Sequence, residues 1–80
     1  MEKSLFSKGY TSFLRQLREA RKKSGLTQIE LAERLGETQS FISKCERGER
    51  RIDVVELRTF CNAMGVSFVD FVKGFDSSIR

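Results

Sequence analysis

The sequence predicts an all-α fold, a compact single domain of five helices. Three observations lead to this prediction. Apolar residues recur at spacings of three and four, as on a helix with one buried face, and no useful run alternates as a strand does. Helix-capping residues alternate with glycines along the chain. With 80 residues and no proline, the chain suits one domain whose helices are not interrupted.

The first helix is expected over about residues 11–23. Its apolar residues follow at spacings of four and three: Phe13, Leu17 and Ala20. Thr11 or Ser12 precedes them as an N-cap, and Gly25 follows the helix, where a left-handed residue commonly ends one. Residues 1–9 are then a flexible N-terminal arm, and the domain proper covers about residues 10–75.

Two short helices are expected next, over about 28–35 and 39–47. Thr27 followed by Glu30 has the spacing of a capping box, and Thr38 is an N-cap for the second of the two. Gly36 ends the first. Their apolar positions are Ile29, Leu31, Ala32, Leu35, Ile42 and Cys45.

The last two helices are expected over about 54–64 and 68–73. Asp53 with Glu56, and Ser67 with Asp70, again have capping-box spacing. Gly65 and Gly74 follow the two helices as left-handed C-terminal residues, and residues 76–80 form a frayed tail. Apolar residues are dense here: Val54, Leu57, Phe60, Cys61, Met64, Phe68, Val69, Phe71, Val72 and Phe75.

Composition argues against catalysis. The chain has no histidine, which removes histidine bases and histidine metal ligands, and two cysteines cannot build a structural zinc site. No metal or cofactor is therefore expected. Cys45 and Cys61 fall on apolar helical positions and are interpreted as reduced core thiols rather than a disulfide or redox switch. No apolar run could span a bilayer, so the expected location is the cytoplasm.

The charge distribution indicates a polyanionic partner. The net charge is +4 and the isoelectric point is about 9.4. Residues 1–51 carry twelve basic and seven acidic side chains, a net charge of +5, whereas residues 52–80 carry three and four, a net charge of −1. A binding surface is therefore expected in the first two-thirds of the chain.

Residues 28–47 have the spacing of a helix-turn-helix, a motif that binds DNA. Two short helices that cross steeply need small residues where their backbones approach, and Ala32 and Gly36 supply them. The apolar positions of the two helices would fix their angle. This pattern, its caps and its basic surroundings together favour a DNA-binding function.

The chain resembles the XRE/Cro/cI family of phage-repressor-like transcriptional regulators over about residues 13–73. The resemblance is carried by Gly25-Leu26-Thr27-Gln28, Leu31-Ala32, Gly36, Gln39-Ser40-Phe41-Ile42-Ser43-Lys44, Glu46-Arg47-Gly48-Glu49-Arg50-Arg51, and the stretch from Leu57 to Ser67. It implies a five-helix domain like that of lambda repressor, in which the second and third helices form the helix-turn-helix. It also implies binding to double-stranded DNA as a homodimer.

The resemblance implies base contacts from the third helix, which would enter the major groove. The implied residues are Gln39, Ser40, Phe41, Ser43 and Lys44. Gln39 could pair with adenine and Lys44 with guanine. Phe41 has two readings: its ring presses on a thymine methyl group or folds back against the domain. Contacts to phosphates are implied for Thr27, Gln28, Arg47, Arg50 and Arg51, with a solvated charged loop as the alternative for the three arginines.

Two further roles follow from the family. Arg21 and Glu46 match positions that form a structural ion pair between the first and third helices. Four residues match a region that often lies at a two-fold interface: Phe68, Phe71, Val72 and Phe75. They are interpreted as a dimer interface, with a simple cover of the core as the alternative.

The sequence therefore predicts a sequence-specific DNA-binding regulator, a repressor or an autoregulatory controller, that binds a roughly palindromic operator. An antitoxin-type module that binds a partner toxin is the second hypothesis, and the short C-terminal tail argues against it. An enzyme is the third, and no paired carboxylates or phosphate-binding loop support it. No small-molecule ligand is expected.

Overall fold

Helices make up most of the computed structural model, which describes residues 7–80. They are α1 (Lys8–Lys23), α2 (Gln28–Leu35), α3 (Gln39–Glu46), α4 (Val54–Met64) and α5 (Phe68–Ser78). No strand occurs among residues 7–80, so the all-α prediction is confirmed. None of these helices is long and apolar enough to cross a membrane.

Local sequence signals set most of the helix boundaries. Thr27 Oγ1 accepts from the Glu30 amide at 3.1 Å while Glu30 Oε1 accepts from the Thr27 amide at 2.9 Å, a complete capping box at the start of α2. Asp53 and Glu56 form the same box at the start of α4, with distances of 2.7 and 3.0 Å. The predicted starts of both helices are therefore confirmed.

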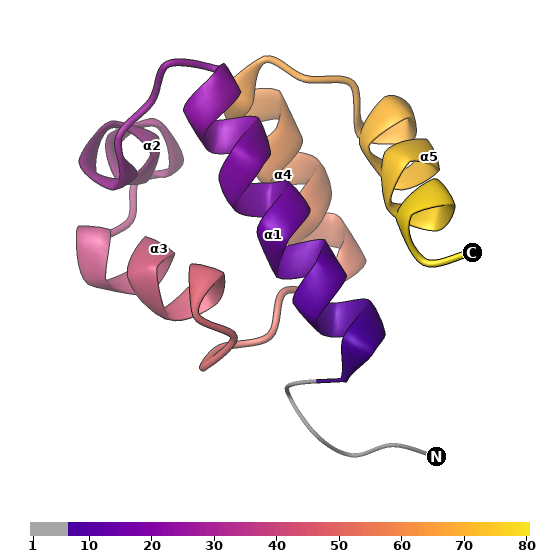
Figure 1. Ribbon diagram of the computed structural model, residues 1–80. Coiled ribbons are helices and arrows are strands. Elements are labelled where there is room, and N and C mark those ends of the chain that lie inside the picture. Colours follow the sequence, from indigo (N-terminus) through magenta and orange to yellow (C-terminus); the bar gives the residue numbers. More distant parts are fainter. Residues whose placement is uncertain (1–6) are drawn as a thin grey trace.

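α1 crosses the middle of the molecule in front of α4 (Figure 1). α2 and α3 lie on one side of α1 and α5 lies on the other. α3 and α5 each contact α1, and α2 and α5 each contact α4. The helix-turn-helix is therefore mounted on one flank of the bundle and the phenylalanine-rich helix on the opposite flank.

The core draws residues from all five helices and the loop before α2. Its fully or nearly fully buried apolar members are Phe13, Leu14, Leu17, Leu26, Leu31, Ala32, Ile42, Cys45, Phe60, Cys61, Met64 and Phe71. Both cysteines are free and buried. Burial raises the pKa of the Cys45 thiol to about 11, so this thiol stays protonated at neutral pH. The interpretation of both cysteines as core thiols is confirmed.

The start of α1 differs from the prediction. The helix begins at Lys8, and its N-cap is Ser7, whose hydroxyl accepts from the Tyr10 amide at 3.1 Å. Neither Thr11 nor Ser12 is the cap. The extra turn places Tyr10 against the core, where its ring centroid lies 5.3 Å from that of Phe13. Residues 8 and 9 of the predicted arm are therefore helical, and residues 1–6 lie outside the described residues.

The end of α5 also differs. The helix does not stop at residue 73 but runs through Gly74 to Ser78, and Gly74 has an ordinary helical backbone rather than a left-handed one. A Cβ on Gly74 would lie 2.9 Å from Gln16 Nε2 of α1. The glycine therefore permits close packing of two helices instead of ending one. The Ser78 and Ser12 hydroxyls, 2.8 Å apart, tie the last turn to α1, so most of the predicted tail is helical.

Candidate nucleic-acid interface

The predicted helix-turn-helix is present in α2, α3 and the turn between them. Gly36 ends α2 with a left-handed backbone, φ +67°, and the Glu37 amide donates to the Ala32 carbonyl at 2.9 Å. Ala32 is 2% exposed, and Leu31 and Ile42 are fully buried. Small and apolar residues therefore hold the two helices together, as the spacing predicts.

One face of α3 is open to solvent. Gln39, Ser40 and Lys44 are exposed, and Ser43 is half-buried beside them. Ile42 and Cys45 point inward and are fully buried. The helix starts at a Thr38 cap, whose hydroxyl accepts from the amide of the third helical residue at 3.1 Å. The polar residues predicted to contact bases therefore share the accessible side of a helix whose other side is packed in the core.

Phe41 folds back against the domain, as in the second of the two predicted alternatives. It is half-buried, and its ring centroid lies 6.3 Å from that of Phe60 in α4. The guanidinium carbon of Arg50 lies 5.0 Å from the centroid of the same ring. This packing removes part of the Phe41 ring from water and so stabilises the position of α3 against α4.

The predicted ion pair between Arg21 and Glu46 is present and buried. Arg21 is 8% exposed and Glu46 is 2% exposed. Arg21 Nε donates to Glu46 Oε2 at 2.6 Å and Arg21 Nη2 donates to Oε1 at 3.0 Å, a bidentate pair that joins α1 to α3. The third guanidinium nitrogen, Nη1, donates to the Leu26 carbonyl at 3.0 Å. The pair thus also fixes the loop that leads into α2.

Hydrogen bonding keeps Glu46 charged despite its burial. Burial alone would raise the pKa of this carboxyl, but hydrogen bonds from Arg21 and Gln28 and the charges of Arg21 and Arg18 outweigh it. The pKa of Glu46 therefore lies below its ordinary value.

Gln28 links this pair to the surface of α3, a connection that the sequence did not reveal. Gln28 Nε2 donates to Glu46 Oε1 at 3.0 Å, and Gln28 Oε1 accepts from Gln39 Nε2 at 2.8 Å. A predicted phosphate contact and a predicted base contact are therefore hydrogen-bonded to each other. Thr27, also predicted to contact phosphate, is exposed beside them and caps α2. A helix N-terminus of this kind favours an anion.

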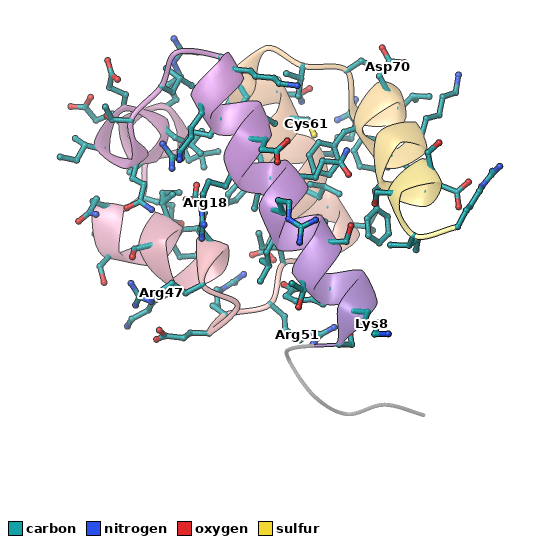
Figure 2. All side chains as sticks on the ribbon, viewed as in Figure 1. Lys8, Arg18, Arg47, Arg51, Cys61 and Asp70 are labelled. Carbon is teal, nitrogen blue, oxygen red and sulfur yellow. The ribbon has the colours of Figure 1, made fainter. Side chains whose placement is uncertain are left out.

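Arg47 lies exposed beside the C-terminal end of α3 (Figure 2). Its Nε donates to Glu49 Oε2 at 2.6 Å, and its Nη1 donates to the Ser43 hydroxyl. The hydrogen bond with Glu49 raises the pKa of Arg47 and lowers that of Glu49. Both side chains are about half exposed, and such pairs contribute little to stability, so Arg47 can exchange this carboxylate for a phosphate.

Arg50 and Arg51 follow in the loop before α4. Arg50 Nη2 lies 2.7 Å from Glu56 Oε2, and this hydrogen-bonded carboxylate raises the pKa of Arg50. The guanidinium carbon of Arg51 lies 4.2 Å from the centroid of the Tyr10 ring. Both side chains are exposed yet held by contacts within the protein, so neither belongs to a freely solvated loop.

Arg18 is a further candidate that sequence reasoning missed. In Figure 2 it extends from α1 toward α3. Its Nη2 donates to the Glu46 backbone carbonyl at 3.4 Å, while about half of its side chain, 48%, stays exposed. The signal was its place three residues before Arg21, which puts both arginines on one face of α1. Arg18 therefore adds positive charge to the side of the molecule that presents α3.

The residues predicted at a dimer interface divide between core and surface. Phe71 is a core residue, 6% exposed, with its ring edge-on to Phe13, so its assignment to a dimer surface is wrong. Phe68 and Phe75 are half-buried against the core. Val72 is 40% exposed and its neighbour Val69 is 59% exposed.

An open apolar groove of about 500 Å³ lies beside these residues. α1, α4 and α5 form it, and its apolar lining includes Tyr10, Phe13, Ile52, Val54, Leu57, Val72 and Phe75. Val54 at its edge is 65% exposed. The groove, which includes Val72, and the exposed Val69 provide accessible apolar surface on this flank.

The geometry agrees with comparisons to known proteins. Residues 17–71 match a family model described as helix-turn-helix. The HTH-type transcriptional regulator y4dJ of Sinorhizobium fredii is 40% identical over 58 residues, which cover 72% of this chain and 75% of that protein.

Two solved structures resemble the whole domain. An XRE-family-like protein from Pseudomonas syringae pv. tomato has a TM-score of 0.83 at 42% identity, covering 90% of this chain and 88% of that one. A mutant of the restriction–modification controller protein C.Esp1396I has a TM-score of 0.81 at 26% identity, covering 91% and 92%. The chain therefore belongs to the XRE-type helix-turn-helix family of transcriptional regulators.

Proposed function

We propose that this regulator binds a specific double-stranded DNA sequence through α3 and controls transcription from a roughly palindromic operator. The observation that carries the proposal is the exposed polar face of α3, formed by Gln39, Ser40 and Lys44 on a helix whose opposite face is fully buried. The core holds one side of this helix, and the other side presents side chains that can hydrogen-bond to base edges. Such a helix is suited to the major groove of DNA.

The proposed base contacts are Gln39 to adenine and Lys44 to guanine, with Ser40 and Ser43 close enough along α3 to reach a base or a phosphate. Phe41 is left out of this set because its ring packs on α4.

The proposed phosphate contacts flank α3 on both sides. Thr27 and Gln28 stand at the start of α2, where the helix terminus favours an anion. Arg47, Arg50 and Arg51 follow α3, and their exposed guanidinium groups can exchange their present partners for phosphates. These contacts would set affinity and orientation, whereas the α3 residues would set sequence preference.

The proposed active form is a homodimer assembled over the groove flank, with Val69, Val72 and Phe75 at the contact. α5, which carries these three residues, lies on the side of α1 opposite α2 and α3 (Figure 1), so pairing through α5 would leave both copies of α3 free. Two such helices would meet successive major grooves about 34 Å apart. We also propose a cytoplasmic location, because a regulator of transcription has to reach DNA.

Selection of bound duplexes from random DNA tests the proposal. We expect enrichment of a two-fold symmetric sequence with half-sites about one helical turn apart. Gln39→Ala should lower affinity for the selected duplex by about 1–3 kcal/mol and relax the preference at one base-pair position of each half-site. Recovery of no preferred sequence would overturn sequence-specific binding.

Arg50→Ala is the matched control for base reading. It should weaken binding to selected and random duplexes alike and reduce the dependence of affinity on salt, because it removes a phosphate contact. An equal loss on all duplexes with Gln39→Ala would contradict base reading by that residue.

The alternative of an antitoxin-type module is not favoured, since the comparisons are with transcriptional regulators. One solved relative is a restriction–modification controller protein, which supports an autoregulatory controller as readily as a repressor.

A further inference from the structure

A chain of four hydrogen-bonded side chains runs from the core to the DNA-facing surface proposed above. It starts at Arg21 on α1, passes through Glu46 at the end of α3 and Gln28 at the start of α2, and ends at Gln39 at the start of α3. From Glu46, which is 2% exposed, exposure rises through the half-buried Gln28 to the exposed Gln39. A buried charge is thus connected to a surface amide through a single intervening side chain.

The buried carboxylate dictates how the first amide points. A glutamine amide has one end that donates and one end that accepts, and either end can usually be turned toward a partner. An ionised carboxylate only accepts hydrogen bonds, so Gln28 has to turn its Nε2 toward Glu46 Oε1, at 3.0 Å. Glu46 is held in its charged form by the bidentate Arg21.

The orientation passes on to Gln39. Since Nε2 of Gln28 faces the carboxylate, its Oε1 faces outward and only accepts, and Gln39 has to turn its own Nε2 toward it, at 2.8 Å. This leaves Gln39 with one N–H and one carbonyl oxygen for DNA. Adenine offers N7 as an acceptor and N6–H as a donor, which matches that pair, whereas guanine offers two acceptors, N7 and O6.

We infer that Glu46 is a positioning residue for base recognition: acting through Gln28, it fixes the amide of Gln39 so that this residue accepts adenine and rejects guanine. The inference rests on the proposed DNA-binding function. It assigns Glu46 a role beyond the ion pair with Arg21. A purely structural role would change stability and overall affinity but would leave the preference between adenine and guanine unchanged.

Two variants break the chain at different points. Arg21→Met combined with Glu46→Met removes the carboxylate and its partner together, because an apolar pair of similar volume commonly replaces a buried ion pair without loss of stability. Gln28→Met interrupts the chain beyond Glu46 and leaves the bidentate ion pair intact. If the double variant does not fold, Gln28→Met still tests the inference. Gln28→Met also loses a proposed phosphate contact, so only the ratio of affinities is informative for it.

The base that Gln39 contacts is first identified as the position at which Gln39→Ala relaxes the sequence preference. The measurement is then the affinity for two duplexes that differ only there, one with adenine and one with guanine. We expect the wild-type protein to prefer adenine, and both variants to lose at least about fivefold of that preference. The side-chain amide of Gln39 gives a second readout without DNA. In nitrogen-15 spectra its hydrogen-bonded proton should shift upfield in both variants, because Gln28 is absent from one and is no longer oriented by the carboxylate in the other.

The outcomes separate the inference from the proposed function. If the wild-type protein prefers adenine and both variants keep the same ratio of adenine to guanine affinity, the inference is overturned and the proposed function stands. A wild-type protein that prefers no base overturns the proposed function and, with it, the inference. A preference for adenine that is present in the wild-type protein and lost in both folded variants supports both.

Discussion

Glu46 shows how a single residue can serve two requirements. Its side chain is 1% exposed, yet every partner around it donates: Arg21 through two nitrogens, Gln28 through its amide. A buried carboxylate is tolerated only when its oxygens are satisfied in this way. The carboxylate that Arg21 keeps charged also orients Gln28. The α1–α3 contact and the arrangement of polar side chains on α3 therefore depend on one group.

The lowered pKa of Glu46 predicts a stability that depends on pH. A carboxyl whose pKa is lower in the folded state contributes its full stabilisation above its ordinary value of about 4.3, and this contribution is lost as the pH falls through the lowered value. We expect the melting temperature to fall between about pH 5 and pH 2. The fall should be smaller for Arg21→Met with Glu46→Met, in which the other acidic groups are unchanged. An identical pH profile for both proteins would contradict the assignment.

Removing only one partner of the pair is the complementary test. Glu46→Ala leaves the Arg21 guanidinium buried without its carboxylate and should lower the free energy of unfolding at neutral pH by about 3–5 kcal/mol. Urea denaturation measures this loss directly.

At the scale of helices, two glycines that look alike in the sequence have different roles. Gly36 ends α2 with φ +67°, a backbone conformation that L-amino acids with a Cβ rarely adopt. Gly74 has a helical backbone inside α5 and faces Gln16, whose Nε2 donates to the Phe71 carbonyl at 2.7 Å. The first glycine shapes the turn of the helix-turn-helix, and the second brings α5 close to α1.

The two glycines should respond differently to alanine. Gly36→Ala should lower the free energy of unfolding by about 1–2 kcal/mol because of backbone strain. Gly74→Ala gains roughly 0.5–1 kcal/mol of helix propensity but forces the Gln16 amide to move, at the cost of a hydrogen bond of similar value, so its net effect should be close to zero. Urea denaturation of both variants checks this, and equal losses would contradict the distinction.

At the scale of the whole molecule, the bundle separates two surfaces. The basic side chains Arg18, Arg47 and Arg50 lie around α3, whereas Val69, Val72 and the apolar groove, which Arg51 borders, lie toward α5. α1 lies between α3 and α5 in Figure 1 and contacts both helices. This separation allows one face to bind DNA while the other contacts a second copy.

Val72→Glu should disrupt the proposed homodimer. An interface with two-fold symmetry contains the same residue twice, so the substitution would bring two carboxylates into one apolar contact. We expect sedimentation to show a dimer for the wild-type protein and a monomer for this variant at the same micromolar concentration.

Ile29→Glu is the matched control for that experiment, because Ile29 is also an exposed apolar residue, 59% exposed, but lies on α2 outside the groove. It should leave the dimer intact. A wild-type protein that sediments as a monomer, or a Val72→Glu variant that remains dimeric, would contradict an interface on this flank.

The sequence by itself determined the elements of this protein. Caps at Thr27, Thr38 and Asp53 act within one helical turn, and apolar spacing of three and four marks the buried face of each helix. These signals are local, so the fold class, four of the five helix starts and the helix-turn-helix were all predictable. The ion pair of Arg21 and Glu46 was predictable only through the family resemblance.

Tertiary structure alone decided what depends on residues far apart in the chain. It set Gly74 of α5 against Gln16 of α1, turned Phe41 onto Phe60, and buried Phe71 against Phe13. It also joined Gln28 to Glu46 and Gln39, 18 and 11 residues away along the chain. Side-chain packing and amide orientation are set by partners that meet only when the helices assemble, so no local pattern records them.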